Sequence, residues 1–344
     1  MREGRLTCDF DLDSFTHVPL FSGRRRACLV VAASVAALAV RWVGAAVIPV
    51  TPPGPLVQVS HVAVDPNHSG MVYAAAFVSA SRSFTVFKST DAGASWVEVG
   101  QSLLHNASLF GIAVDSESSV YVNSSGDGIH RSTDGGSTWE PVAGGGHNIV
   151  ADQVSPGGTI YTYVFGINKS VDGGVTWADA SSGLGDPLPG EPGPMVSALA
   201  IDRRNPSTLY AGRWEMGIYK STDGGSSWHE LDMGLRPSGV LSIAVDPNNS
   251  SIVFAGTAED GLFKSADGGA HWAWVDTGQP NPQVSALTID QGSAIYAGFY
   301  DCCVLVSTDG GATWNDADPA LRHAYVRSVV ADLSRPGTVY VGSM

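Results

Sequence analysis

The sequence predicts an all-β fold, a β-propeller of four-stranded blades, and three observations lead to this prediction. The 344 residues include 41 glycines, and only 15% of the residues are charged, which is typical of β structure with many tight turns. The pattern Ser-x-Asp-x-Gly-x-x-Trp occurs six times, with its tryptophans 38 to 51 residues apart. A period of this length in β-rich sequence indicates propeller blades.

Each repeat is expected to form one blade of four strands, A to D. An apolar run ending in Asp forms strand A, and a second run with an aromatic residue forms strand B. In the fifth copy, strands A to D fall at about 241–246, 252–257, 261–265 and 271–275. The motif forms the C–D hairpin, because its Gly permits positive φ and its Ser and Asp can bond nearby backbone N–H groups.

The six motif copies are predicted to be structural, with each Trp buried between strands. Their aspartates and tryptophans are Asp91, Asp134, Asp172, Asp223, Asp267 and Asp309, and Trp96, Trp139, Trp177, Trp228, Trp272 and Trp314.

The Asp that ends strand A recurs seven times, one more than the motif. The seventh unit ends at Val341 to Met344, so its strands C and D are missing. We therefore expect six complete blades plus an incomplete seventh, either truncated or closed imperfectly. Leu56 to Gln58 are a candidate closing strand, and an open edge would favour self-association.

Three segments are expected: a signal or anchor at 1–50, a Pro-rich linker at 51–58 and the propeller at 59–344. The basic cluster Arg24 to Arg26 precedes an uncharged run at 27–40, which is typical of a signal peptide or an N-terminal anchor. A spanning helix needs about 20 residues, a length that 27–50 reaches only if Arg41 snorkels. A buried helix is the alternative. The sequence favours a secreted or extracytoplasmic protein, released or tethered to a membrane by this segment.

The net charge of −14 would repel a phosphate backbone, which argues against nucleic acid as a partner. No Cys-x-x-Cys pair occurs, so no zinc site is expected, and nothing in the sequence indicates another metal or a cofactor. Cys302 and Cys303 are adjacent. They form either two reduced thiols on a strand or a vicinal disulfide.

The repeated motif resembles the Asp box of the BNR/Asp-box superfamily, over about residues 59–344. That superfamily includes sialidases, xyloglucan hydrolases, the sortilin ectodomain and photosystem II assembly factors, and the resemblance implies a β-propeller. It does not imply one function, because all these proteins share the repeat. The motif is called the Asp box below.

None of these relatives is matched throughout. The Arg-Ile-Pro signature of sialidases is absent, and Arg203 and Arg204 fall in an A–B turn, away from the expected ligand face. The first Asp box, at Phe87 to Gly93, lacks the Ala-Arg-Thr-Asp pattern of xyloglucan hydrolases, which also use two propellers. The chain has the size of photosystem assembly factors but not their arginine patch, and it lacks the cysteine-rich module of sortilin-type receptors.

The B–C and D–A loops are expected to surround one mouth of the central channel and to carry any ligand site. Facing carboxylates there could serve glycoside hydrolysis, although solvated turns also collect acidic residues. Trp214 has no role in the repeat, so it either contacts a ligand or plugs the channel mouth. The catalytic candidates are Asp127, Glu215, Asp260 and Asp301, and the ligand-binding candidates are Arg213, Trp214, Glu215 and Tyr300.

The sequence therefore favours an exported, non-catalytic propeller that acts as a binding or scaffold module for a protein, peptide or glycan. The alternative is a glycoside hydrolase, sialidase- or xyloglucanase-like, that uses paired carboxylates of the B–C loops. Two carboxylates about 5–10 Å apart across an open cleft would favour the enzyme.

Overall fold

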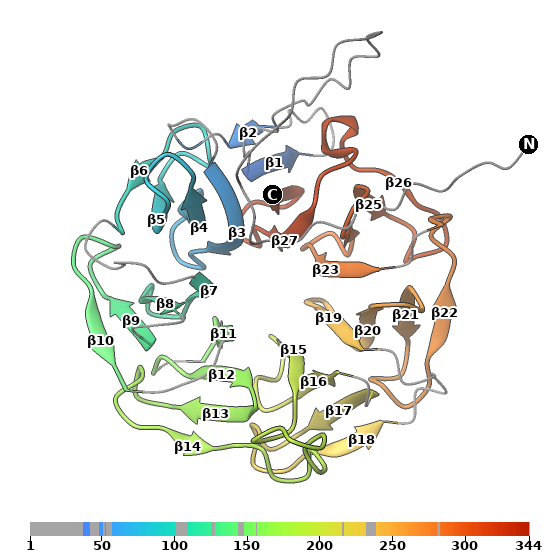
Figure 1. Cartoon of the computed structure of the whole chain (residues 1–344). Helices are drawn as coiled ribbons and strands as arrows, with labels where there is room; N and C mark the ends of the chain where they lie inside the picture. Colours follow the sequence, from blue (N-terminus) through green and yellow to red (C-terminus); the bar gives the residue numbers. More distant parts are fainter. Residues whose placement is uncertain are drawn as a thin grey trace, which may run out of the picture. The chain divides into compact units, whose positions relative to one another are not determined.

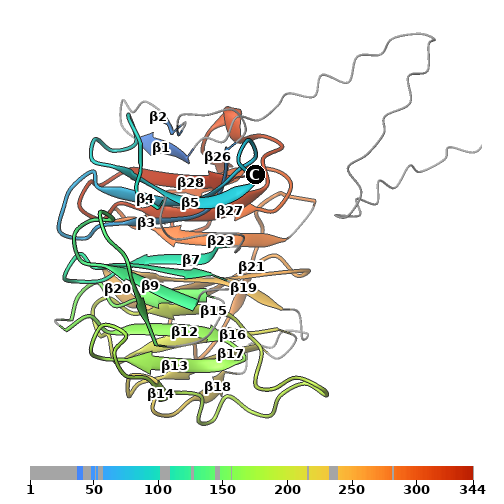
Figure 2. The ribbon, with the colours of Figure 1, turned by 60° about the vertical axis from the view of Figure 1, so that its left-hand side comes forward.

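The computed structural model describes residues 37–41, 48–50, 52, 57–100, 109–124, 128–143, 148–155, 157–214, 217–231, 239–280 and 283–343. The chain divides into two units, Met1–Ala32 and Ala33–Met344, and every described residue belongs to the second. The described strands form seven four-stranded antiparallel sheets, arranged as blades around a central axis (Figure 1); Figure 2 shows the same blades from the side. The predicted all-β propeller is confirmed.

Blade 1 contains β3 (Val57–Val64), β4 (Val72–Val78), β5 (Ser83–Ser89) and β6 (Val97–Glu98). Blade 2 contains β7 (Leu109–Val114), β8 (Val120–Ser124), β9 (Gly128–Ser132) and β10 (Glu140–Val142). Blade 3 contains β11 (Asn148–Ala151), β12 (Ile160–Val164), β13 (Gly166–Ser170) and β14 (Ala178–Asp179). Blade 4 contains β15 (Val196–Ile201), β16 (Leu209–Arg213), β17 (Gly217–Ser221) and β18 (His229–Leu231). Blade 5 contains β19 (Val240–Asp246), β20 (Asn249–Thr257), β21 (Leu262–Ser265) and β22 (Ala273–Val275). Blade 6 contains β23 (Val284–Ile289), β24 (Ile295–Phe299), β25 (Val304–Ser307) and β26 (Asn315–Asp316). Blade 7 contains β27 (Val326–Ala331), β28 (Thr338–Ser343), β1 (Ala37–Arg41) and β2 (Ile48–Val50).

The described residues contain one helix, the 3-10 turn η1 (Pro319–Leu321). No helix in this described part is long and apolar enough to cross a membrane.

The hydrophobic core lies between blades rather than within them. Tyr73 of blade 1, for example, packs in one cluster with Ile112 and Val114 of blade 2. A single blade cannot bury both of its faces alone, so each blade depends on its neighbours. The buried strand-B aromatic recurs in all seven blades, as Tyr73, Tyr121, Tyr161, Tyr210, Phe254, Tyr296 and Tyr340.

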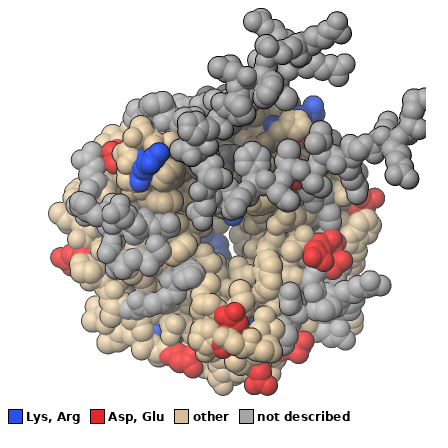
Figure 3. Space-filling view, in the orientation of Figure 1, with Lys and Arg blue, Asp and Glu red and all other residues tan. Residues whose placement is uncertain are grey.

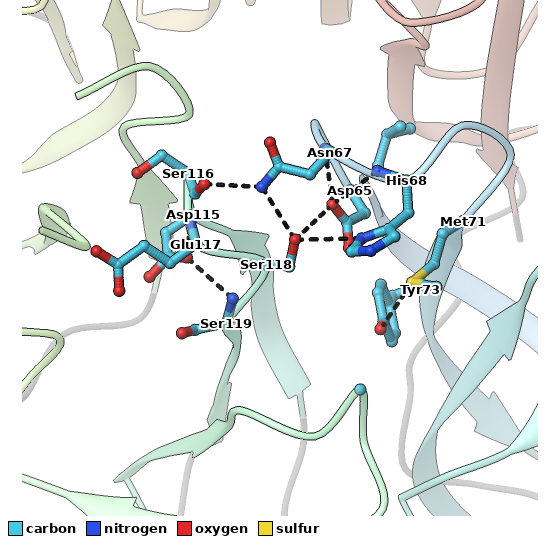
Figure 4. A network of polar contacts seen from close by, with 12 residues as sticks. Asp65, Asn67, His68, Met71, Tyr73, Asp115, Ser116, Glu117, Ser118 and Ser119 are labelled. Carbon is cyan, nitrogen blue, oxygen red and sulfur yellow. Dashed lines mark hydrogen bonds and ion pairs between the residues drawn. The ribbon is translucent and has the colours of Figure 1, made fainter. Parts of the chain in front are cut away.

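The Asp at the end of strand A organises the A–B turn and joins neighbouring blades. The Oδ1 of Asp65 accepts the N–H of Asn67 at 2.9 Å. The Nδ2 of Asn67 donates to the carbonyl of Ser116 in blade 2 at 2.7 Å, and the Oγ of Ser118 donates back to Asp65 at 2.9 Å (Figure 4). Because the Asp is buried, these bonds replace its lost water. The same exchange joins blades 5 and 6, through Asp246, Asn248, Gln291 and Ser293.

The Asp box forms the C–D hairpin as predicted. In blade 3, the Oγ of Ser170 donates to Asp172 Oδ1 and accepts the N–H of Gly174, both at 2.8 Å. Thr176 donates to the same carboxylate from its N–H at 2.9 Å and from its Oγ1 at 2.6 Å. Gly174 has φ +94°, a conformation that its lack of a Cβ makes accessible.

The Asp-box tryptophans are less uniformly buried than predicted. Trp96 and Trp228 are buried, whereas the other four are half-buried. All six lie at the same position, directly before the outermost strand of their blade, so the degree of burial depends on what the neighbouring blade places against each ring. Trp228 is the best covered, and its Nε1 donates to the carbonyl of Ala180 in blade 3 at 2.7 Å.

All four lysines of the chain occupy the residue before an Asp-box serine, a pattern that the sequence analysis missed. The Nζ of Lys220 lies 5.2 Å from the ring centroid of Tyr210 and donates to the carbonyl of Gly268, in the Asp box of the next blade, at 2.7 Å. Val306 takes this position in blade 6, whose neighbour has no Asp box. The other three lysines make the same contact: Lys88 to Gly135, Lys169 to Gly224 and Lys264 to Gly310.

The seventh blade corrects one expectation. Of the described strands, β28 is the last in sequence; β1 pairs antiparallel with it, and β2 pairs with β1. The blade therefore has four strands, the outer two drawn from the segment expected to be a signal or anchor. Residues 57 and 58, part of the candidate closing strand, instead begin β3. An unpaired β28 would expose a row of backbone hydrogen-bonding groups, and β1 satisfies them.

Candidate functional site

The candidate site lies at the end of the propeller formed by the B–C and D–A loops. In each four-stranded antiparallel sheet these loops share one end, and the A–B turns and Asp boxes share the other. In Figure 3, acidic atoms are scattered around the rim, and basic atoms are visible both on the rim and near the central opening.

The four carboxylate candidates are not seen to form a group. Asp127 and Glu215 lie outside the described residues. Asp260 and Asp301 are placed on the B–C loops of blades 5 and 6, as predicted. Within the described ranges, no three His, Cys, Asp or Glu side chains are placed to hold a metal ion.

Arg213 was expected to contact a ligand, but its side chain is fully buried. Its Nη1 donates to the carbonyl of Leu184 at 2.6 Å and its Nη2 to that of Asp186 at 2.7 Å. Its guanidinium also lies 5.8 Å from the ring centroid of Tyr219. Arg213 therefore fastens the D–A loop between blades 3 and 4 and offers no surface to a ligand.

Trp214 lies on the candidate face with 37% of its surface exposed. One side of the indole packs on Gly239, where an added Cβ would come within 3.1 Å of the ring. The main-chain N–H of Trp214 donates to the carbonyl of Met195 at 3.1 Å. The ring is thus packed against Gly239 while part of the residue stays exposed.

Further aromatic residues of this face are exposed on nearby blades. Phe165 lies on the B–C loop of blade 3, and Tyr325 lies on the D–A loop before blade 7. Trp274 extends from β22 toward the B–C loop of its own blade, where its Nε1 donates to the carbonyl of Asp260 at 3.2 Å. We call this set, together with Trp214 and Tyr300, the aromatic arc.

Tyr300 was a candidate from the sequence, and the structure adds its neighbours. Its ring contacts that of Tyr325 edge to face, with 5.5 Å between centroids. The guanidinium of Arg327, on the innermost strand of blade 7, lies 5.2 Å from the Tyr300 centroid.

Arg327 also affects His61, on the innermost strand of blade 1. Burial, and secondarily the charge of Arg327, lower the pKa of His61 to about 4. His61 is therefore neutral near pH 7, and Arg327 supplies positive charge beside it.

The central channel is lined by valine and isoleucine side chains, with a cavity of about 230 Å³ between the inner strands. Arg203 lies in the A–B turn of blade 4, as predicted, and its side chain lines this cavity. Its Nη1 donates to Gln153 Oε1 at 2.5 Å, and Gln153 Nε2 donates to the carbonyls of Val64 and Val114 at 3.2 Å each. Burial lowers the pKa of Arg203.

Cys302 and Cys303 form a disulfide, which settles the alternative that the sequence left open. Both cysteines line a cavity of about 410 Å³ on the candidate face. Asp301 and Asp316 line the same cavity, and Asp316 Oδ2 accepts the Nε–H of Arg322 at 2.8 Å. Of the two carboxylates that line the cavity, that of Asp316 is therefore paired with a guanidinium.

No protein-family model matches the sequence, and no curated protein matches it. Solved structures do. The GH74 enzyme of Niastella koreensis matches with a TM-score of 0.62 and 19% identity, and the GH74 xyloglucanase of Xanthomonas campestris with 0.62 and 21%. Each match covers 79% of this chain but 49% of the enzyme, so the chain spans about half the length of these proteins.

YCF48 from Cyanidioschyzon merolae matches with a TM-score of 0.63 and 16% identity over 85% of this chain and 97% of that one. A structure of YCF48 bound to D1 peptide matches with 0.61 and 14%, over 90% and 100%. Identities this low show a shared fold and not a shared activity. Together with the six Asp-box hairpins, they show that the chain has a β-propeller fold of the BNR type.

Proposed function

We propose that this protein is an exported, non-catalytic propeller that binds a polypeptide segment across the B–C/D–A face. The observation that carries the proposal is the aromatic arc, which places exposed rings on one face from blade 3 to the loop before blade 7. Water solvates such rings poorly, and exposed aromatic residues on one face are typical of contact surfaces. A chain of residues could place successive side chains against them.

Two further observations support a polypeptide ligand. The fold matches YCF48 over nearly its whole length, including a structure that contains a bound peptide, but matches only about half of the GH74 enzymes. The polar groups near Tyr300 and Trp214 include backbone carbonyls and Arg327, which suit peptide groups and acidic side chains. The acidic rim disfavours anionic surfaces as partners.

Export remains part of this proposal, and it rests on the basic and apolar pattern of residues 24–50. Cleavage after residue 50 would remove β1 and β2, whereas an uncleaved anchor would keep them. Because Ala37–Arg41 and Ile48–Val50 pair as β1 and β2 in blade 7, they cannot also lie in a membrane, so we propose that they are retained in the exported protein and that any cleavage precedes Ala37. N-terminal sequencing of the protein recovered from its native cell envelope tests this: a mature terminus beyond Val50 contradicts retention.

The test of binding uses the full chain on an array of random 15-residue peptides, beside a glycan array that includes xyloglucan fragments. We expect peptide binding that Trp214→Ala reduces at least tenfold while the melting temperature stays nearly unchanged. Val175→Ala removes an exposed apolar residue of the Asp-box face and is the matched control. Binding of glycans alone would contradict the proposal. A Trp214→Ala variant that loses stability but not binding would identify Trp214 as a plug of the channel mouth.

The glycoside hydrolase remains a second candidate because Asp301 and Asp316 line one cavity. Two carboxyl groups are what that chemistry requires, one as acid and one as base or nucleophile. Asp316 is engaged by Arg322, which weakens its case as a proton donor. Release of reducing sugar from a polysaccharide, abolished by Asp301→Asn and retained in Asp179→Asn, would establish the enzyme in place of the binding module.

A further inference from the structure

We infer that the Cys302–Cys303 disulfide is a redox-sensitive element that sets the arrangement of the aromatic arc. This inference rests on the proposed function, because it concerns regulation of the same surface. It starts from a disulfide that lies in the wall of a cavity on the candidate face, rather than in the core of a blade.

The disulfide is accessible from one side only. It lies in the B–C turn between β24 and β25, where Cys303 is buried and Cys302 is half-buried. An incoming thiolate can therefore reach the sulfur of Cys302 more readily than that of Cys303. Attack at an exposed disulfide sulfur is what thiol–disulfide exchange requires.

The two cysteines also hold two separate parts of the surface. The carbonyl of Cys303 accepts the N–H of Phe299 at 2.9 Å, which closes the turn that carries Tyr300. The carbonyl of Cys302 accepts the N–H of His323 at 2.5 Å, which holds the loop that carries Tyr325. The ring closed by a disulfide between adjacent residues includes their shared peptide bond. The ring therefore restricts the backbone dihedral angles that set the directions of the Cys302 and Cys303 carbonyls.

Tyr300 and Tyr325 meet edge to face at 5.5 Å, and Arg327 lies over Tyr300. Their relative positions depend on the two loops that the cysteine carbonyls hold. When the ring opens, it no longer fixes the geometry of the bonds from Phe299 and His323 to the cysteine carbonyls, whereas other bonds of these loops, such as Tyr300 N–H to the carbonyl of Gln283, do not involve the cysteines. The oxidised turn thus favours one arrangement of this end of the arc, and the reduced turn permits others.

The reduction is balanced with a dithiol as co-reactant. One thiolate of the dithiol bonds to the sulfur of Cys302, the disulfide breaks, and Cys303 leaves as a thiolate that takes up a proton. The second thiolate of the dithiol then displaces Cys302, which also takes up a proton, and the dithiol becomes a disulfide. Gln279 Oε1 lies 3.2 Å from the sulfur of Cys302, so the new thiol has an acceptor within reach.

The experiment uses the full chain with Cys8→Ser and Cys28→Ser, so that only the pair titrates with thiol reagents. Amide hydrogen exchange is measured before and after treatment with dithiothreitol. We expect at least tenfold faster exchange at Phe299 and His323 after reduction. The controls are the Asp-box amides of Gly225 in blade 4 and Gly269 in blade 5, each bonded to the serine of its own box. Their exchange rates should be the same before and after reduction. Adding Cys302→Ser and Cys303→Ser should give fast exchange with or without dithiothreitol.

Equal exchange at Phe299 and His323 in both redox states overturns the inference, as does finding two free thiols in protein purified without reductant. A binding measurement separates this inference from the proposed function. If oxidised and reduced proteins bind the selected peptides equally while exchange differs, the redox effect is confined to the loops and the inference about the arc fails. If neither form binds any peptide, the proposed function fails while the exchange result still stands.

Discussion

At the scale of single residues, the Trp of the Asp box is expected to contribute differently to stability in different blades. Trp228 is 2% exposed and contacts blade 3, whereas Trp272 is half-buried. Trp228→Ala should lower the free energy of unfolding by about 3–5 kcal/mol, as for other large buried aromatic residues. Trp272→Ala should cost less, because less of its surface leaves water on folding. Urea unfolding of the two variants checks this, and equal losses would show that blade position does not matter.

The Asp-box carboxylates predict how stability depends on pH. Hydrogen bonds from the residue four positions later lower the pKa of four of them to about 2, namely Asp134, Asp172, Asp223 and Asp267. In an unfolded chain the pKa of Asp is about 3.9. The folded state therefore binds fewer protons between these values, so the stabilisation is complete above about pH 4 and is lost as the pH falls toward 2.

Asp172→Asn should flatten this dependence, because the amide cannot titrate. Val171→Ala, in the same hairpin, should leave the slope unchanged. Urea midpoints between pH 2 and pH 6 provide the measurement. If Asp172→Asn keeps the full slope, the box carboxylate does not cause it.

At the scale of elements, the lysines connect strand C of one blade to the Asp box of the next. Lys220→Met removes the charged donor but keeps much of the apolar stem, and leaves the carbonyl of Gly268 without this partner. We expect a loss of about 1–2 kcal/mol, since hydrogen bonds from charged groups contribute about that much. Arg131 takes the same position in blade 2 and keeps the contact with the strand-B ring, but it donates to Ser119 of its own blade, so Lys220→Arg should restore only part of the loss. Thermal unfolding of the two variants checks this; equal melting temperatures would contradict the role of the charge.

At the scale of the whole molecule, blade 7 joins sequence-distant strands. β1 pairs with β28 from Leu38 with Val341 to Arg41 with Thr338. A chain lacking residues 1–54 should expose the edge of β28, and such edges pair with other chains. We expect that variant to form oligomers in size-exclusion chromatography and the variant lacking residues 1–32 to remain a monomer. Two monomeric variants of equal stability would show that β1 and β2 are dispensable.

The sequence by itself determined the blades, because a repeated hairpin motif depends on local hydrogen bonds and on alternation within each strand. The six Asp boxes, the A–B turns and the identification of Trp214 as a residue without a role in the repeat follow from it. The tertiary structure alone decided that Arg213 is buried, that Arg203 lines the channel and that Cys302 and Cys303 are bonded. It also decided that β1 completes blade 7. These features depend on which residues distant in sequence become neighbours, and a local pattern carries no information on how a ring of blades closes.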